Sequence, residues 1–200
     1  MFKALVGSVK SERGDGRDIC PRTAVGYNAK MAMQRTLVLI KPDGVERKLI
    51  GEIVSRFERV GLKIIGLKMI KVDETFAKRH YTEDLAIRRG QHVRDNMVTM
   101  LTSGPVIAMA LEGVDAIDLV RKHVGVTEPK SAAPGTIRGD YAHTSLARGD
   151  ELGIGVYNLV HASSDEKDAK TELSLWFAET ELCQYSTDHD KHVFGERKVS

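Results

Sequence analysis

The chain has 200 residues, 42% of them hydrophobic and 29% charged, which is typical of a globular protein rather than a fibrous or disordered one. A formal net charge of +2 gives no bulk attraction to nucleic acids or membrane surfaces, so neither is predicted as a partner. No apolar stretch approaches the roughly 20 residues that a membrane-spanning helix needs. Cys20 and Cys183 are isolated thiols, which favours a reducing compartment such as the cytoplasm.

The first segment, residues 1–33, is predicted to be a flexible tail. It mixes glycine, proline and both charge signs without helical or strand periodicity. Its basic residues would suit an organelle transit peptide, but its acidic residues fit that poorly, and a translated leader upstream of a start at Met31 or Met33 is equally open. We expect a folded domain over residues 34–200.

Strands and helices alternate through this domain, which predicts an α/β sheet covered by helices. Gly61 and Gly125 are placed to end two of the helices, and Asp73 is placed to cap a third. In chain order we expect a strand at 36–40, a helix at 49–61, a strand at 62–72, a short helix at 74–81, a buried strand at 105–111, a helix at 115–125 and a last strand at 156–160.

His161 directly follows the last predicted strand. Ser163 and Glu166 have the spacing of a capping box, so a helix is expected to begin there, with an apolar face at Ala169, Leu173, Trp176 and Phe177. A junction between a strand end and a helix start favours anion binding. An isolated histidine is more often an ordinary loop residue, however, so its position alone does not assign a function.

Three cations accompany this histidine in the sequence. Lys41 ends the first strand before "PDG", Arg121 lies one turn before a helix end, and Arg138 lies in the turn-rich "PGTIRGD". Each alone is best interpreted as a solvated surface residue. Together with an imidazole they suit a polyphosphate site, although the chain contains neither a Walker motif nor a kinase glycine loop.

An ordered set of motifs makes the interpretation specific: "RTLVLIKPDGVERKLIGEIVSRFERVGLKIIGLKM", "HY", "TSGPVIAMALEG", "VGVTEP", "PGTIRGDYA" and "NLVHAS". From about Gln34 to Trp176 the chain resembles a nucleoside diphosphate kinase. The resemblance implies a ferredoxin-like βαββαβ fold of the α/β (α+β) class, with a four-stranded antiparallel sheet covered by helices. It also implies Mg²⁺-dependent transfer of the γ-phosphate of ATP to nucleoside diphosphates, and a homo-oligomer, either a hexamer or a tetramer, built from dimers.

The resemblance further implies a role for each matching residue. His161 matches the nucleophile, which carries the phosphoryl group as phosphohistidine in a ping-pong reaction. Glu172 matches a carboxylate that orients the imidazole through a serine, here Ser163, and Tyr81 matches a tyrosine beside the histidine. The matches to residues that hold the nucleotide are Lys41, Val93, Arg121, Thr127, Arg138 and Asn158.

Three departures from the family pattern are visible in the chain. The acidic residue that follows the histidine is displaced by one position, to Asp165. The connection before His161 is longer than usual, so we expect an exposed loop or hairpin as an insertion at about residues 142–154. The segment 82–97 lacks the paired phenylalanines on which the base stacks, and Val93 falls nearest that position; the loss weakens stacking by about 1–3 kcal/mol.

The residues around His161 also predict a backbone bend. Strict strand alternation would put Asn158 and His161 on opposite faces of the sheet, yet both are expected in the same cleft. We therefore expect a kinked or strained backbone at or near His161.

No protein metal site is predicted. The polar group Asp188, His189, Asp190 and His192 resembles a loose metal cluster but is interpreted as solvated. The Mg²⁺ implied by the resemblance is expected to be carried by nucleotide phosphates and water.

Two alternatives to catalysis stay open at this point. A regulatory module that kept the nucleotide cleft but lost turnover would fit the three departures. An RNA-binding sheet face would need exposed strand aromatics, and the predicted strands offer only Tyr157. The kinase is favoured because the chemically important residues are intact: Lys41, Arg121, Arg138, Asn158, His161 and Glu172.

Overall fold

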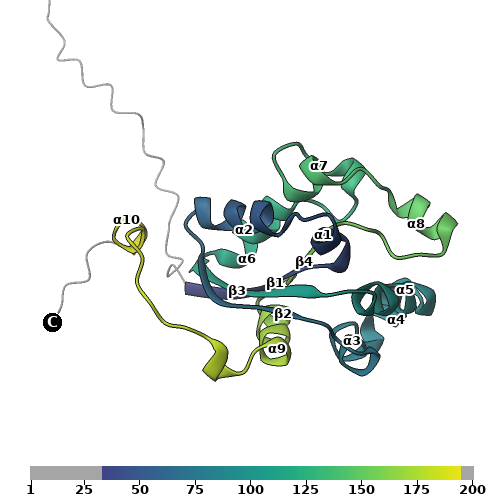
Figure 1. Ribbon diagram of the computed structural model, residues 1–200, viewed down its shortest axis with the longest axis horizontal. Helices are drawn as coiled ribbons and strands as arrows, with labels where there is room; N and C mark the ends of the chain where they lie inside the picture. Colours follow the sequence, from purple (N-terminus) through teal and green to yellow (C-terminus); the bar gives the residue numbers. More distant parts are fainter. Residues whose placement is uncertain (1–32, 195–200) are drawn as a thin grey trace, which may run out of the picture. The chain divides into compact units, whose positions relative to one another are not determined.

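The computed structural model describes residues 33–194, which form a four-stranded antiparallel sheet with helices on both faces (Figure 1). The strand order is β2-β3-β1-β4, so β1 and β3 lie in the middle. This confirms the predicted sheet. The strands are β1 (Met33–Ile40), β2 (Lys63–Ile70), β3 (Val106–Val114) and β4 (Val160–Ala162).

Two separate cores explain why β1 is a continuous apolar run. Val38 and Ile40 belong to the core on one face, whereas Leu37 and Leu39 belong to the core on the other. A strand that is buried on both faces has no polar side to expose, so alternation is lost. In Figure 1, α2 (Ile50–Arg59) and α6 (Ala116–Val124) lie above the sheet, and α3 (Glu74–His80) and α9 (Glu166–Trp176) lie below it.

The predicted helix ends agree with the structure at several points. The Asp73 side chain accepts a hydrogen bond from the Phe76 amide and so caps α3, and Gly61 and Gly125 have positive φ values of 84° and 86° after α2 and α6. The remaining helices are α1 (Pro42–Glu46), α4 (Glu83–Arg89), α5 (Gln91–Thr102), α7 (Ile137–Tyr141), α8 (Leu146–Leu152) and α10 (Asp190–Phe194), with 3₁₀ turns at Pro129–Ser131 and Glu179–Glu181.

The segment 142–154 is not the loop or hairpin that we expected, because its centre forms α8. The Ser145 hydroxyl accepts a hydrogen bond from the Arg148 amide and caps the helix start. Gly153 then adopts a left-handed conformation, with φ 62°, and ends the helix. Ser145 and Gly153 flank the seven residues of the helix, and a capping serine followed by a terminal glycine is a signal for a helix. The charged and glycine-containing composition of the segment led us to expect a loop instead.

The last strand is also displaced from its predicted position. Residues 156–159 are not part of it, and β4 includes His161 rather than ending before it. The cause is a tight turn centred on Leu159, whose φ is +70°. The Val160 amide closes this turn by donating a hydrogen bond of 2.8 Å to the Asn158 carbonyl. The bend predicted between Asn158 and His161 is therefore confirmed.

The predicted capping box at Ser163 is wrong. The N-cap of α9 is Asp165, whose Oδ1 accepts a hydrogen bond from the Asp168 amide at 2.8 Å. The Ser163 hydroxyl is used elsewhere, because it donates to Glu172 Oε2 at 2.6 Å and accepts from the Leu37 amide of β1 at 3.3 Å. The displaced acidic residue thus serves as the helix cap.

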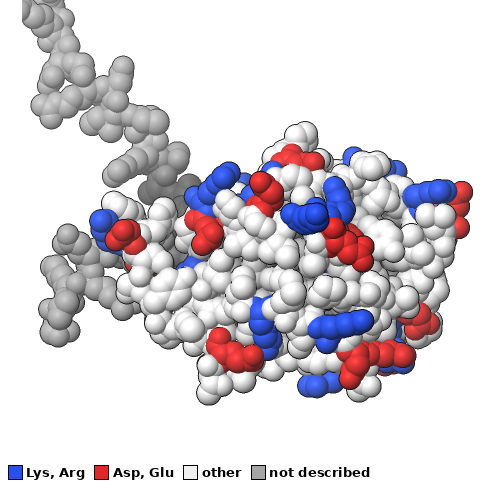
Figure 2. Space-filling view, viewed as in Figure 1, with Lys and Arg blue, Asp and Glu red and all other residues white. Residues whose placement is uncertain are grey.

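The described surface carries both charge signs in an interspersed pattern, with no single-sign field on the face that Figure 2 shows. Within residues 33–194, none of the helices has the length and apolar composition needed to cross a membrane. The tail predicted over residues 1–33 lies outside the described residues except for Met33, which begins β1.

Candidate active site

A cavity of about 320 Å³ opens between the end of β1, β4, α5 and α6. The structure brings seven of the predicted residues together on its wall: Lys41, Tyr81, Arg121, Thr127, Arg138, Asn158 and His161. Ser163 and Glu172 lie behind His161 rather than on the wall, and Val93 is not among the lining residues. Met97, one turn further along α5, lines the cavity instead.

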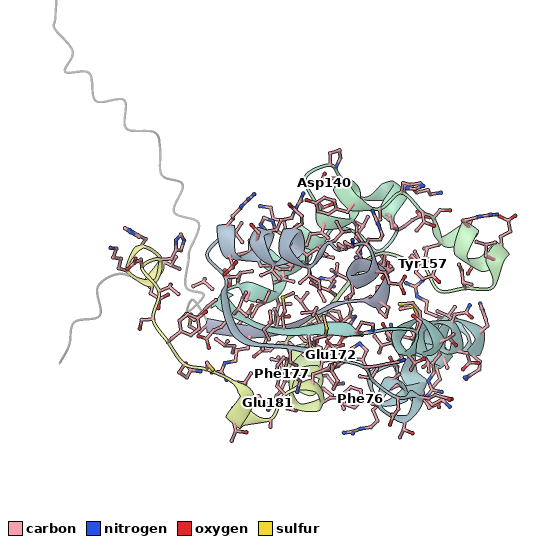
Figure 3. The ribbon with its side chains drawn as sticks, viewed as in Figure 1. Phe76, Asp140, Tyr157, Glu172, Phe177 and Glu181 are labelled. Atoms are coloured by element: carbon pink, nitrogen blue, oxygen red, sulfur yellow. The ribbon has the colours of Figure 1, made fainter. Side chains whose placement is uncertain are left out.

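Glu172 contacts the imidazole directly. Its Oε1 lies 2.9 Å from His161 Nε2, and its Oε2 accepts a hydrogen bond of 2.6 Å from the Ser163 hydroxyl. The expected route through the serine is therefore wrong: Ser163 holds the far oxygen of the carboxylate. Glu172 comes from α9, beneath the sheet (Figure 3), so the helix that follows β4 folds back to support the histidine.

This contact distinguishes the two ring nitrogens of His161. A carboxylate can only accept, so Nε2 donates and carries the proton, and Nδ1 keeps its lone pair. Burial alone would raise the pKa of Glu172, but the interactions with His161 and the Ser163 hydroxyl lower it overall. The carboxylate therefore stays ionised and can hold the imidazole in this tautomer.

A strained turn places His161 and Asn158 on the same cavity. The positive φ of Leu159 is unusual for a residue that is not glycine and is 0% exposed. Its amide donates to Asp43 Oδ2 at 2.9 Å, and its carbonyl accepts from the Lys41 amide at 2.8 Å. Sequence reasoning missed Asp43; the one available signal was its place in "KPDG", two residues after Lys41 of the predicted site.

Lys41 is buried at the end of β1, and its Nζ donates to the Val156 carbonyl at 3.2 Å. Burial lowers the pKa of Lys41 to about 8, with Asp43 opposing the shift and Arg138 adding to it. A cation that is poorly solvated is strongly attracted to an incoming anion.

Arg138 is fixed by its own backbone neighbours. Its guanidinium donates to the carbonyls of Gly125, Asn158 and Val160 at 2.8, 3.2 and 2.7 Å. Burial, followed by the charge of Arg121, lowers the pKa of Arg138 to about 10, so it stays charged at neutral pH. These bonds connect α7 to the turn before His161, which keeps a positive charge at a defined place on the wall.

The other wall residues differ in how firmly they are held. The Asn158 side chain donates to the Thr127 carbonyl at 2.8 Å, so the loop after α6 is joined to the segment before β4. The Tyr81 hydroxyl is buried without a hydrogen-bond partner among the described residues, and burial raises its pKa. An unpartnered hydroxyl on a cavity wall is free to bond a ligand.

The residues that line the cavity combine cations with no carboxylate. Lys41, Arg121 and Arg138 are all on the wall, and Met97, Val124 and Val126 form an apolar portion of it. Such a site favours a ligand that carries several negative charges together with an apolar part.

His80 is a second residue that sequence reasoning missed. Its ring centroid lies 4.6 Å from that of His161, and its side chain is fully buried. With His161 and Glu172 it forms a cluster whose ligand-type atoms lie within 4.8 Å of one another. We interpret this cluster as a hydrogen-bonded support for His161 rather than a metal site, because Glu172 and Trp176 already bond the ring nitrogens that face them.

Comparison with known proteins agrees with this geometry. The family model for nucleoside diphosphate kinase matches residues 34–182. A nucleoside diphosphate kinase of Borreliella burgdorferi is 46% identical over 161 residues, which cover 80% of this chain and 96% of that protein. A nucleoside diphosphate kinase of Sulfurisphaera tokodaii is 51% identical over 152 residues, 76% of this chain and 94% of that protein.

Solved structures give the same result. A transition-state mimic of the Borrelia burgdorferi nucleoside diphosphate kinase, with bound vanadate and ADP, superimposes with a TM-score of 0.81 at 44% identity and covers 82% of this chain and 99% of its own. The Halobacterium salinarum enzyme in complex with CDP gives 0.70 at 41% identity, covering 81% and 99%. The chain belongs to the nucleoside diphosphate kinase family, whose members are phosphotransferases acting on nucleotides.

Proposed function

We propose that His161 Nδ1 is the nucleophile of a ping-pong phosphoryl transfer between nucleotides. The observation that carries the proposal is the 2.9 Å contact between Glu172 and Nε2, beside a cavity lined by three cations. It leaves Nδ1 as the nitrogen with a free lone pair, so no base is needed to activate the histidine.

The reaction has two balanced halves. In the first, Nδ1 attacks the γ-phosphorus of ATP, an N–P bond forms, the bond to the bridging oxygen breaks, and ADP leaves with that electron pair. In the second, a terminal phosphate oxygen of a nucleoside diphosphate attacks the same phosphorus and the N–P bond breaks. The phosphorylated ring is cationic, because Nε2 keeps its proton, and Glu172 balances that charge.

The cations on the wall account for most of the remaining catalysis. Arg138 is held by its backbone bonds, and Lys41 is buried, so both are positioned before the ligand enters. Preorganised charges stabilise the charge that develops on the phosphate oxygens at little reorganisation cost. Arg121 is exposed on α6 and is suited to phosphates nearer the cavity mouth.

The divalent metal that we propose is Mg²⁺. No residue lining the cavity in the described part of the chain is a carboxylate, so the donor set fits an ion held by phosphate oxygens and water rather than by protein. Such an ion lowers the negative charge of the phosphates. The protein's own task is to bind and orient those phosphates.

The substrates that we propose are ATP and nucleoside diphosphates with little selection among bases. The vanadate and ADP bound by the Borrelia relative and the CDP bound by the Halobacterium relative support a shared cavity for different bases. Met97 and Val126 offer apolar contact to a base but no pattern of hydrogen-bond donors and acceptors for its edge. We also propose a cytoplasmic location, which two isolated cysteines suit.

We further propose that the chain forms a homo-oligomer built from dimers, either a tetramer or a hexamer. β2 is an edge strand of the sheet, and its Leu67 and Met69 side chains are 53% and 59% exposed. An apolar edge strand is a surface that proteins usually cover.

The test is a two-stage phosphate chase. The protein is incubated with γ-labelled ATP and Mg²⁺, freed of nucleotide, examined for acid-labile label and then given GDP. We expect label on the native protein, transfer of that label to GTP, and no label on His161→Gln. A folded native protein that binds nucleotide but takes up no label would replace this account with that of a nucleotide-sensing module.

A further inference from the structure

His80 is close to the reacting histidine but has no role in the mechanism described above. It is the last residue of α3, its side chain is 0% exposed, and its ring packs edge-on against His161 at 4.6 Å. Figure 3 shows Phe76 of the same helix and Glu172 of α9 on one side of the sheet. His80 therefore lies in the layer beneath the sheet that supports the active site.

A hydrogen bond from Trp176 fixes the proton of His80. The indole Nε1 donates to His80 Nδ1 at 3.3 Å, and a nitrogen that accepts carries no proton. The proton of the neutral ring is therefore on Nε2, which is buried and has no partner among the described residues. The buried Nε2–H has no partner in the described part of the chain and costs free energy, whereas Nδ1 satisfies the indole N–H of Trp176. Phenylalanine at both positions would remove both polar groups, so packing alone does not explain this pair.

The fixed nitrogen faces the carboxylate that orients the nucleophile. His80 Nδ1 lies 4.0 Å from Glu172 Oε1, the same oxygen that lies 2.9 Å from His161 Nε2. If Nδ1 carried a proton, this oxygen would have a second donor close by, and a small shift of the carboxylate would weaken its bond to His161.

We propose that His80 is a positioning residue: the bond from Trp176 keeps His80 Nδ1 an acceptor, so that Glu172 Oε1 is left to His161. The inference rests on the proposed function and adds a third layer to it. Trp176 acts on His80, His80 acts on Glu172 by not donating to it, and Glu172 holds the imidazole.

The charges around His80 support this arrangement. The titratable groups that face it are His161 from β4, Glu172 from α9 and the adjacent Tyr81. Burial, with a smaller effect from His161, lowers the pKa of His80 to about 3 despite the opposing effect of Glu172. The ring therefore stays uncharged at neutral pH, and only its tautomer has to be fixed.

The test compares Trp176→Phe with the double variant Trp176→Phe, His80→Phe. We expect the single variant to be phosphorylated by ATP about tenfold to a hundredfold more slowly, because His80 becomes free to donate to Glu172. Its affinity for ADP should not change, since Trp176 does not line the cavity. The double variant has no competing nitrogen and should recover most of the rate, although it carries more substitutions in the same core.

A matched control is Phe76→Leu. The ring of Phe76 packs edge-on against that of Trp176, with 4.9 Å between the ring centroids. The substitution therefore disturbs the same core but keeps the bond from Trp176 to His80. The rate of phosphorylation by ATP should stay close to that of the wild type. A normal rate in Trp176→Phe, or a double variant no faster than the single one, would overturn the inference. Label on wild type and none on His161→Gln would leave the proposed function intact in either case.

A second measurement does not depend on any variant folding well. Nitrogen-15 spectra of histidine-labelled wild-type protein report which ring nitrogen of His80 is protonated. We expect the Nε2–H form alone in the wild-type protein. A wild-type spectrum that shows the Nδ1–H form would contradict the proposal.

Discussion

His161 has two ring nitrogens in different surroundings, because Nε2 is bound by the Glu172 carboxylate while the residue itself lines the cavity. Other side chains hold the turn that precedes it. Asp43 supports the strained turn at Leu159, and Arg138 bonds the carbonyls on either side of that turn. The position of the nucleophile therefore depends on residues from α1 and α7 as well as on its own strand.

The charge of Lys41 makes nucleotide binding depend on pH. In the free protein its pKa is about 8, so it is charged below that pH and becomes neutral as the pH rises through it. We expect the affinity for ADP to fall above about pH 8, by up to roughly tenfold per pH unit, because one positive charge is lost from the wall. Calorimetric titration across this range is the measurement.

The matched control for this prediction is Lys41→Met, which removes the titrating group. Its affinity for ADP should be lower throughout and should lack the decline above about pH 8. A wild-type affinity that is constant well beyond that pH would show that Lys41 does not contribute its charge to the site.

At the scale of elements, the short helix α7 matters because it carries Arg138. A Cβ at Gly139 would overlap the Ala133 carbonyl, which is backbone and cannot move aside cheaply. We expect Gly139→Ala to destabilise the fold by about 1–3 kcal/mol, as overpacking does, and to lower the affinity for nucleotide because Arg138 shifts. Urea unfolding and ADP titration measure the two effects.

Gly51 in α2 provides the contrast, since a Cβ there would meet nothing within 4 Å. Gly51→Ala should stabilise the fold by about 0.5–1 kcal/mol through helix propensity alone, with unchanged nucleotide affinity. If Gly139→Ala leaves the affinity for ADP as unchanged as Gly51→Ala does, the packing of α7 does not position Arg138.

The elements also show what the sequence could predict. β1, β2, β3 and the ends of α2, α3 and α6 follow from local signals, namely apolar periodicity, Asp73 as a cap and glycines after helices. β4 could not be placed in this way, because the turn at Leu159 depends on Asp43 and Lys41, which are distant in sequence. Ser163 was misassigned for a related reason: its hydroxyl bonds Glu172 and the Leu37 amide of β1 instead of an amide of the following helix.

The residues of the candidate site also differ in whether the sequence could predict them. Seven of the cavity-lining residues were predicted through family motifs, whereas Met97 on the wall and His80 and Asp43 behind it were not. His80 and Asp43 act on other protein groups, and such a role depends on tertiary contacts that periodicity and composition do not reveal. Met97 replaces the expected Val93 on the wall because the two are four residues apart on α5, where a one-turn shift changes which side chain faces the cavity.

For the whole molecule, the uncovered part of β2 predicts self-association. The Cys183 amide bonds the Ile65 carbonyl on this strand, so the chain covers one part of the edge itself, while Leu67 and Met69 stay exposed. We expect Leu67→Lys with Met69→Lys to lower the molar mass measured by light scattering. Ile87→Lys on α4, where the residue is 83% exposed, is the control and should leave the mass unchanged.

The most direct test of the whole account is the position of the phosphate on the phosphorylated protein. Phosphorus-31 and nitrogen-15 spectra of the isolated phosphoenzyme identify the modified atom. The 2.9 Å contact between Glu172 and Nε2 predicts a single species, phosphorylated on Nδ1 of His161. Phosphate on Nε2 would contradict this proposal, because the nitrogen that bonds Glu172 would then be the one that reacts. Phosphate on any other residue would show that His161 is not the nucleophile.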